Sequence, residues 1–422
     1  MTSATQQQSD VWERQDLLTG CQAVAEGVRL ADVDVIPAYP IRPYTEVMDT
    51  ISKIIADGRL DAEYMIADSE HSQFEIAKHA SAVNARAFTG SSGTGWCYGF
   101  EALVVTATDR LPVLFLVGNR ALDDPGAFGV EHNDAMSVRD MGFLLNWVTS
   151  PQEALEHVLI GYRIAEDSEV RMPMALAMDG AFLTHSQHIV QIPTIESVRR
   201  FLPDYDLGDR RLHPDNPISI APQVNEDWVM EMRRQNWGAA RRAREVIVKA
   251  YEEFNAVYGP RYQPPYYFTE YMTDDADVVL VGLGTVAAPG RTAVRRLREQ
   301  GHKVGYVNLR WFRPFPTVEL RECLSRFKAV GVIDRDFAHG SPDDGGILLH
   351  EIRSCLYPAK NRPAVVNFLS GLGGRDISIQ DCEKMFDLTE KAARDETMDG
   401  YVTWIGVRAG AGSSNYLAAP AH

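Results

Sequence analysis

Two stretches of this 422-residue chain alternate short apolar runs with longer amphipathic segments, and this alternation constrains the fold most strongly. In residues 16–188, segments 69–83 and 94–108 have the spacing of amphipathic helices. The apolar runs around them are predicted to be buried strands, at 33–38, 64–67, 85–89, 113–117 and 174–178. Such alternation is typical of a parallel sheet covered by helices, so an α/β fold is predicted.

Residues 275–390 repeat the pattern. Strands are predicted at 277–283, 303–309, 329–333 and 364–369. Helices are predicted between these strands, at 286–300, 318–327 and 346–356. This stretch is therefore predicted to form a second α/β unit with its own sheet.

The segment between the two stretches differs in composition. Prolines interrupt a polar run between Pro203 and Pro222, and a charged helix is predicted from about Asn225 to Tyr258. Residues 409–422 are rich in Gly, Ala and Ser and are predicted to be flexible. We therefore predict a first domain, a linker with one long helix, a second domain and a flexible tail, over 1–188, 189–265, 266–408 and 409–422.

Charge and composition exclude several classes of protein. The net charge of −16 argues against a nucleic-acid-binding surface, which would be basic. The five cysteines are scattered, which favours reduced thiols over a metal site. The most apolar stretch, 102–117, is short and broken by Asp109 and Arg110, so no membrane span is predicted. The first ten residues lack a secretory signal, and we expect a cytoplasmic protein.

Glu70 is the leading catalytic candidate. It follows an apolar strand, and Ser69 is placed to cap the helix that begins there. Open α/β sheets bind ligands at the carboxyl ends of their strands, where Glu70 would lie. On these residues alone, a carboxylate that merely favours the helix dipole explains the position as well.

Arg120 is a candidate for binding a carboxylate. It lies in the loop that follows the predicted strand 113–117. A guanidinium there can grip a carboxylate through two parallel hydrogen bonds, although a surface ion pair is the simpler alternative.

The sequence Gly282-Leu-Gly284 resembles part of a dinucleotide-binding fingerprint, because it follows a strand and precedes a helix. The next predicted strand is followed by Arg310, however, and not by an acidic residue that could bind a ribose. A tight strand–helix turn is the alternative explanation.

Several short motifs, taken in order, resemble the α subunits of 2-oxoacid:acceptor oxidoreductases, which use thiamine diphosphate. The resemblance spans about residues 16–408 and rests on Tyr39-Pro40-Ile41-Arg42-Pro43, Ser69-Glu70, Arg120-Ala121-Leu122, His132-Asn133-Asp134, the block 310–316 and Ile333-Asp334-Arg335-Asp336. It implies a pyrimidine-binding parallel-sheet domain followed by a transketolase carboxy-terminal-like α/β domain.

The resemblance also implies roles for single residues. Glu70 would be catalytic, because in this family a glutamate meets N1′ of the aminopyrimidine and favours the tautomer that activates the cofactor. Further cofactor contacts are expected from Ser69, Pro40, Ser91 and Ser92. Substrate contacts are expected from Tyr39, Arg42, Arg120, His132 and Asn133.

Half of the expected site is missing from the chain. There is no Gly-Asp-Gly followed by Asn-Asn, the family's pattern for Mg²⁺ and the diphosphate, and no Cys-x-x-Cys for an iron–sulfur cluster. The resemblance therefore implies that thiamine diphosphate is shared with a β subunit that holds Mg²⁺. Further partners would be a γ subunit, a ferredoxin-like iron–sulfur subunit and a subunit with FAD that reduces NAD, arranged as a dimer of heteromers. No metal is expected on this chain.

The prediction of the substrate depends on Arg42. Relatives usually have threonine at this position. The Ile41-Arg42-Pro43 variant and the stretch 129–134 most resemble phenylglyoxylate dehydrogenase. We therefore expect oxidative decarboxylation of phenylglyoxylate with coenzyme A to benzoyl-CoA and CO₂. Alternatives are an oxalate oxidoreductase, in which Arg42 meets a second carboxylate, or an oxidoreductase that passes electrons from pyruvate or another 2-oxoacid to ferredoxin. An NAD-binding dehydrogenase and a non-catalytic scaffold are the alternatives from other classes.

Overall fold

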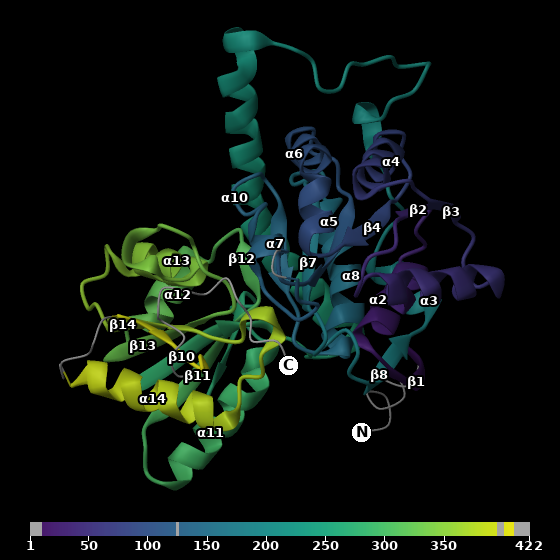
Figure 1. The fold of residues 1–422 in the computed structure, drawn as a ribbon. Helices are drawn as coiled ribbons and strands as arrows, with labels where there is room; N and C mark the ends of the chain where they lie inside the picture. Colours follow the sequence, from purple (N-terminus) through teal and green to yellow (C-terminus); the bar gives the residue numbers. More distant parts are fainter. Residues whose placement is uncertain (1–10, 124–125, 395–400, 409–422) are drawn as a thin grey trace.

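The computed structural model describes residues 11–123, 126–394 and 401–408. Two α/β units lie side by side, and the long helix α10 (Asn225–Tyr258) connects them in sequence and projects from the body (Figure 1). The predicted tail, 409–422, lies outside the described residues. Within these ranges, none of the helices combines the length and apolar character needed to span a bilayer.

The first unit is built on a buried sheet formed by β4 (Phe88–Ser91), β5 (Leu114–Asn119), β6 (Leu144–Trp147), β7 (Met174–Asp179) and β12 (Trp311–Arg313). The strand order is β12-β6-β7-β5-β4. Strands β4 to β7 are parallel, whereas β12 comes from the second half of the chain and pairs antiparallel with β6. A parallel pair, β2 (Val35–Ala38) and β3 (Glu63–Ile66), continues beside β4 through one bridge from Val35 to Ala87.

The helices packed around this sheet are α2 (Gly20–Leu30), α3 (Thr45–Ala56), α4 (Glu70–Ala82), α5 (Gly93–Tyr98), α6 (Phe100–Thr108), α7 (Asn133–Met136) and α8 (Pro151–Ala165). Ser69 and Ser150 each accept a backbone hydrogen bond and so fix the starts of α4 and α8. Between helices and sheet, the rings of Phe74, Trp96 and Phe115 meet edge to face, which anchors α4 and α5 on β5.

An antiparallel ribbon closes the first unit. It pairs β1 (Trp12–Leu18) with β8 (His188–Pro193). The chain then passes through α9 (Ile195–Phe201) and the 3-10 turn η1 (Gly208–Arg210) into α10. The second half of α10 packs on α8 and α9 through apolar residues spaced three or four apart, including Ala243, Ile247 and Phe254.

The second unit contains a sheet with the order β15-β14-β13-β10-β11-β9. Its strands are β9 (Phe268–Tyr271), β10 (Val278–Leu283), β11 (Val304–Leu309), β13 (Ala329–Asp334), β14 (Ala364–Leu369) and β15 (Val402–Trp404). All pairs are parallel except β11 with β9. Its helices are α11 (Ala287–Glu299), α12 (Thr317–Leu324), α13 (Ile347–Leu356) and α14 (Ile379–Ala393), with 3-10 turns η2 (Gly284–Val286), η3 (Pro342–Asp344) and η4 (Leu372–Gly374).

The structure confirms the predicted α/β class and corrects two details. The strand predicted at 64–67 to be buried is β3, in which Met65 and Ile66 are exposed. The single helix predicted over 94–108 is divided into α5 and α6 at Gly99. A β-carbon at Gly99 would lie 2.2 Å from the ring of Phe74, so the close approach of α4 explains this break.

A buried ion cluster joins the two units. Asp179, at the end of β7, is 2.8 Å from the Nε2 atom of His132 and 3.0 Å from the Nη1 atom of Arg335. The backbone N–H and hydroxyl of Thr285 donate to the same carboxylate, at 2.8 and 2.5 Å. Gly284 has a φ of +68°, and a β-carbon there would lie 2.7 Å from the Asp179 oxygens. The carboxylate therefore occupies the turn that resembled a dinucleotide-binding loop.

Removing this carboxylate should loosen the joint. Burial acts to raise the pKa of Asp179, but His132, Arg335 and Thr285 lower it well below its ordinary value. Asp179→Asn leaves Arg335 and His132 buried without their acid, and we expect a loss of about 3–5 kcal/mol in the free energy of unfolding at neutral pH.

The sign of the pH dependence follows from the lowered pKa. The contribution of Asp179 is complete above its unfolded-state pKa and disappears as the pH falls through the folded-state value. Denaturant unfolding at several pH values should therefore show the largest gap between wild type and Asp179→Asn near neutrality and a shrinking gap in acid. Asp387→Asn, which removes an exposed partner of Lys391, is the matched control. It should lower the free energy of unfolding by less than about 1 kcal/mol, the usual range for surface ion pairs. Equal losses of unfolding free energy in both variants would contradict the role of Asp179 in joining the two units.

Candidate functional site

The candidate residues gather at the carboxyl ends of the strands in the first unit. Ser91 ends β4, Asn119 ends β5 and Asp179 ends β7, while the loop after β2 carries residues 39–44. Because these strands are parallel, their following loops meet at one edge of the sheet.

Asp134 holds this edge together. Its fully buried carboxylate accepts hydrogen bonds from the backbone N–H groups of Gly93 (3.0 Å), Arg120 (3.0 Å) and Ala135 (2.7 Å) and from the side chain of Asn119 (2.8 Å). Burial raises the pKa of Asp134, and these donors oppose that shift. One side chain therefore fixes the loops after β4 and β5.

Glu70 lies in the first turn of α4, where the sequence places it, and its side chain is buried, with 7% of the residue exposed. Among the described residues, no group donates a hydrogen bond to its carboxylate. The residue is mostly buried, but its carboxylate oxygens are not among the fully enclosed atoms, so the group can meet a polar partner from outside the chain.

Gly95 allows Glu70 to take this position. A β-carbon at Gly95 would lie 2.2 Å from the Oε1 atom of Glu70 and 2.6 Å from the Cδ1 atom of Ile41. Because Gly95 has no side chain, the carboxylate of Glu70 can pack directly on α5 and lie next to the loop after β2. Gly95 is absent from the sequence-based candidates, although a Gly93-x-Gly95 pair directly after a buried strand is a usable signal for close approach.

Ser91 and Ser92 are fully buried, and within the described part of the chain neither hydroxyl has a hydrogen-bond partner. Ser92 precedes α5 but does not cap it with its side chain. Two buried hydroxyls left without partners at a strand end are unusual, and they fit a polar ligand bound at this edge.

Arg120 already holds a carboxylate. Its Nη2 atom is 3.0 Å from Asp123, its Nη1 atom is 3.3 Å from the carbonyl oxygen of Arg42, and the guanidinium lies over the ring of Phe128. The Nε atom is buried and makes no hydrogen bond with any described residue. The guanidinium is therefore fixed in place by two of its five N–H donors, and its Nε–H is among those left over.

The loop after β2 exposes Arg42. A cis bond joins Arg42 to Pro43, whose ring packs on Gly118. Pro40 and Arg42 are exposed, and Tyr39 is half-buried. The Arg42 carbonyl accepts the bond from Arg120, but its side chain forms no ion pair with any described residue.

His132 and Asn133 lie in the joint between the units. His132 is 2% exposed and bound to Asp179, and the side chain of Asn133 donates to the carbonyl oxygen of Phe337 at 3.1 Å. The structure thus brings together Glu70, Ser91, Ser92, Arg120 and the loop with Arg42. The side chains of His132 and Asn133, in contrast, form their hydrogen bonds with other groups of the protein. Their expected contact with substrate stays a prediction.

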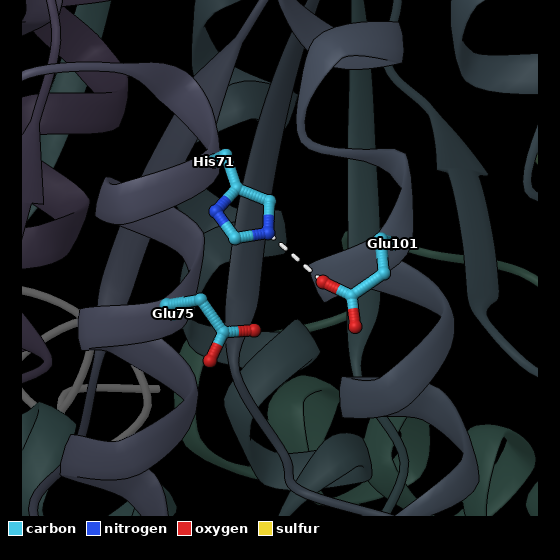
Figure 2. Close-up of side chains that lie close together, drawn as sticks. All are labelled: His71, Glu75 and Glu101. Carbon is cyan, nitrogen blue, oxygen red and sulfur yellow. Dashed lines mark hydrogen bonds and ion pairs between the residues drawn. The ribbon is translucent and has the colours of Figure 1, made fainter.

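One histidine and two glutamates form the group with metal-ligand geometry in the described residues. Ligand atoms of His71, Glu75 and Glu101 lie within 4.8 Å of one another on α4 and α6 (Figure 2). His71 is 2.9 Å from Glu101, and Glu75 is 2.8 Å from Lys78. Since Lys78 already balances one carboxylate and Glu101 is exposed, we assign no metal to this group.

Comparison with known proteins identifies the family. Residues 26–252 match the family described as pyruvate flavodoxin/ferredoxin oxidoreductase, thiamine diphosphate-binding, and residues 276–382 match core domain II of pyruvate:ferredoxin oxidoreductase. The pyruvate synthase subunit PorA of Methanocaldococcus jannaschii is 37% identical over 93% of this chain and 98% of that protein. The chain belongs to the pyruvate:ferredoxin oxidoreductase α-subunit family.

Other relatives agree. The ketoisovalerate oxidoreductase subunit VorA of Pyrococcus abyssi is 35% identical over 92% of this chain and 96% of its own length. Among solved structures, the 2-oxoglutarate:ferredoxin oxidoreductase from Magnetococcus marinus has a TM-score of 0.66 at 18% identity, covering 91% of this chain and 65% of that one. A split-gene transketolase has a TM-score of 0.52 at 13% identity, covering 88% and 99%. These structural likenesses confirm the predicted fold.

Filling the space at Gly95 should displace Glu70. For Gly95→Ala, we expect 2-oxoacid oxidation by the assembled complex to fall by on the order of 100-fold, because a catalytic group shifted by about 1 Å loses that much. Gly238→Ala is the matched control: a β-carbon there, on α10, meets only the flexible end of Arg242 at 3.2 Å. Activity measurements that find both variants equal to wild type would contradict the role of this contact.

Proposed function

We propose that this chain supplies the aminopyrimidine-binding half of the thiamine diphosphate site in a 2-oxoacid:ferredoxin oxidoreductase. The observation that carries the proposal is Glu70, at the carboxyl edge of the sheet. The residue is 7% exposed, and no described group donates a hydrogen bond to its carboxylate. The matched thiamine diphosphate-binding family over residues 26–252 supports it.

The residues at this edge fit the cofactor. Glu70 would accept a hydrogen bond from the pyrimidine ring, and the unpaired hydroxyls of Ser91 and Ser92 offer further polar contacts, with Ser69 and Pro40 at the rim. When bound, thiamine diphosphate supplies the carbanion chemistry that decarboxylates a 2-oxoacid. The part of Glu70 is to hold a negative charge against the ring, away from water, where electrostatic interactions are strong.

The rest of the enzyme is proposed to reside on partner subunits. A β subunit would hold the diphosphate and Mg²⁺, because the chain has no Gly-Asp-Gly…Asn-Asn pattern. Iron–sulfur subunits would carry electrons onward, since the chain also lacks Cys-x-x-Cys, and coenzyme A would accept the acyl group. A subunit with FAD that passes electrons to NAD belongs to the phenylglyoxylate alternative.

The relatives favour an aliphatic 2-oxoacid and a ferredoxin acceptor over phenylglyoxylate and NAD. Those compared are named pyruvate synthase and ketoisovalerate oxidoreductase subunits. Arg120 would bind the substrate carboxylate, and its bond to Asp123 supports this role because it places an acid on the same guanidinium. Phenylglyoxylate remains the second candidate because Arg42, exposed and unpaired within the described residues, could stack on an aromatic ring.

Glu70→Gln tests the catalytic assignment. The amide keeps the shape of the side chain but not its charge, so turnover should fall by roughly 100- to 10,000-fold, as for loss of a general acid or base. Assembly of the complex should persist, which size-exclusion chromatography can verify. Glu75→Gln on the same helix is the control and should retain turnover. Near-normal 2-oxoacid oxidation by Glu70→Gln would remove Glu70 from the mechanism.

A panel of 2-oxoacids tests the two arginines. In the complex, Arg120→Lys should lower kcat/KM for every acid. The loss should correspond to about 1.5–3 kcal/mol of transition-state stabilisation, because lysine cannot make the second charged hydrogen bond that the guanidinium makes. Arg42→Thr should leave kcat/KM for pyruvate and 2-oxoisovalerate within about 0.5 kcal/mol of wild type, as for a surface substitution. Arg199→Thr, which changes an exposed arginine of α9, is the control.

Two outcomes would change the substrate. A wild-type preference for phenylglyoxylate that narrows in Arg42→Thr would favour the aromatic acid and the NAD-linked complex. Oxidation of oxalate that falls by about 2–5 kcal/mol in Arg42→Thr would assign Arg42 to a second carboxylate. Failure of all four acids with the wild-type complex would contradict the proposed reaction class.

A further inference from the structure

A cavity is present away from the candidate site. It has a volume of about 550 Å³, is open to solvent on one side, and is bordered by the end of α6, the segment 218–224 and the first half of α10. Part of its lining is apolar and includes Val105, Ile218, Val229 and Met232, which we call the apolar wall. The same cavity is also lined by Arg110, Arg210 and Arg233, of which Arg233 lies on α10 next to Met232.

The arginines here lack acidic partners. Arg110 donates to the carbonyl oxygen of Val170 and Arg210 to that of Asp109, so both bind backbone groups. Arg171 lies behind them, and the buried Nε atoms of Arg110 and Arg171 have no hydrogen-bond partner in the described ranges. Within those ranges, no carboxylate forms an ion pair with Arg110, Arg171 or Arg210.

The positive charge is consequently in excess. Burial, together with repulsion from Arg210, Arg242 and Arg171, lowers the pKa of Arg110 to about 10. Burial and Arg171 also lower the pKa of Arg210. Nearby acids compensate little: Glu169 pairs with Arg242, and Asp109 is the carboxylate on the cavity wall. This local surplus contrasts with the net charge of −16 of the whole chain.

The cavity is remote from Glu70 and Arg120. Residues 108–110 precede β5 and Arg171 precedes β7, so the arginines lie at the amino ends of strands whose carboxyl ends carry the candidate site. Six strand residues at about 3.3 Å each separate the two edges by roughly 20 Å. A molecule bound here would therefore not be the 2-oxoacid that reacts.

We propose that this cavity binds a nucleotide-type anion, with its phosphates on Arg110 and Arg210 and its base against the apolar wall. Phosphate oxygens match the planar fork of a guanidinium, and a multivalent anion relieves the repulsion among several of them. The apolar wall suits a flat base, and the volume falls in the range of small-molecule sites. The inference does not depend on the proposed reaction.

Thermal unfolding of the full-length chain tests the site, with ADP as probe. ADP at 1 mM should raise the Tm of the wild type by several degrees, because a ligand that binds only the folded state stabilises it. Arg210→Gln should lose most of this shift. Arg211→Gln is the matched control, because it removes the same charge at the next residue. The side chain of Arg211 is exposed and does not line the cavity.

Without ADP, Arg210→Gln should unfold at or above the wild-type Tm, since it removes a charge that is repelled by its neighbours. If that variant is instead destabilised, Arg233→Gln, which changes an exposed arginine of the cavity lining, should still weaken ADP affinity at least threefold in equilibrium dialysis.

Three results would overturn the proposal. The first is an equal Tm shift from KCl at matched ionic strength, which would indicate screening alone. The second is an undiminished ADP shift in both Arg210→Gln and Arg233→Gln. The third is a shift from inorganic pyrophosphate as large as that from ADP, which would show that the apolar wall takes no base.

Discussion

The carboxylate of Asp134 fixes the edge of the sheet on which the candidate site depends. A buried acid normally demands several donors, and Asp134 obtains them from Gly93, Asn119, Arg120 and Ala135. Those bonds hold the backbone after β4 and β5 in one arrangement. Beside this fixed backbone, Glu70 and Ser92 remain without hydrogen-bond donors or partners among the described residues. Unpartnered polar groups held on a backbone that several hydrogen bonds fix are the expected form of a preorganised site.

Asp179 plays a comparable part between the units and explains why a familiar motif misleads. The turn at Gly284 has the positive φ and open backbone N–H groups that suit an anion. The anion it binds comes from within the chain, together with Arg335. A dinucleotide phosphate would have to displace a buried carboxylate, so the loop serves to position the second unit.

Much of the fold was predictable because its signal is local. Apolar runs such as 113–117 and 174–178 identify central parallel strands, and Ser69 marks the start of α4. The antiparallel ribbon β1–β8 and strand β12 escaped prediction because their partners lie far away in sequence and their side chains do not form long apolar runs. At the site, Glu70 and Arg120 follow strands and were found by position. Gly95 and Asp179 act through contacts that only the folded chain creates.

The state of Arg120 bears on how such a site can recognise an acid. Its guanidinium is held by the Arg42 carbonyl and Phe128, while Asp123 binds its outer edge. The side-chain entropy of the arginine is thus lost on folding and not on substrate binding. Asp123 is 30% exposed, so water can stabilise it if another carboxylate takes its place. Exchange of one acid for another keeps the charge of the pocket constant, and the net gain must then come from contacts with the rest of the substrate. The loop that carries Arg42 lies beside this guanidinium, because the Arg42 carbonyl accepts a hydrogen bond from Arg120. We therefore expect Arg42 to bear on specificity and not on the decarboxylation chemistry.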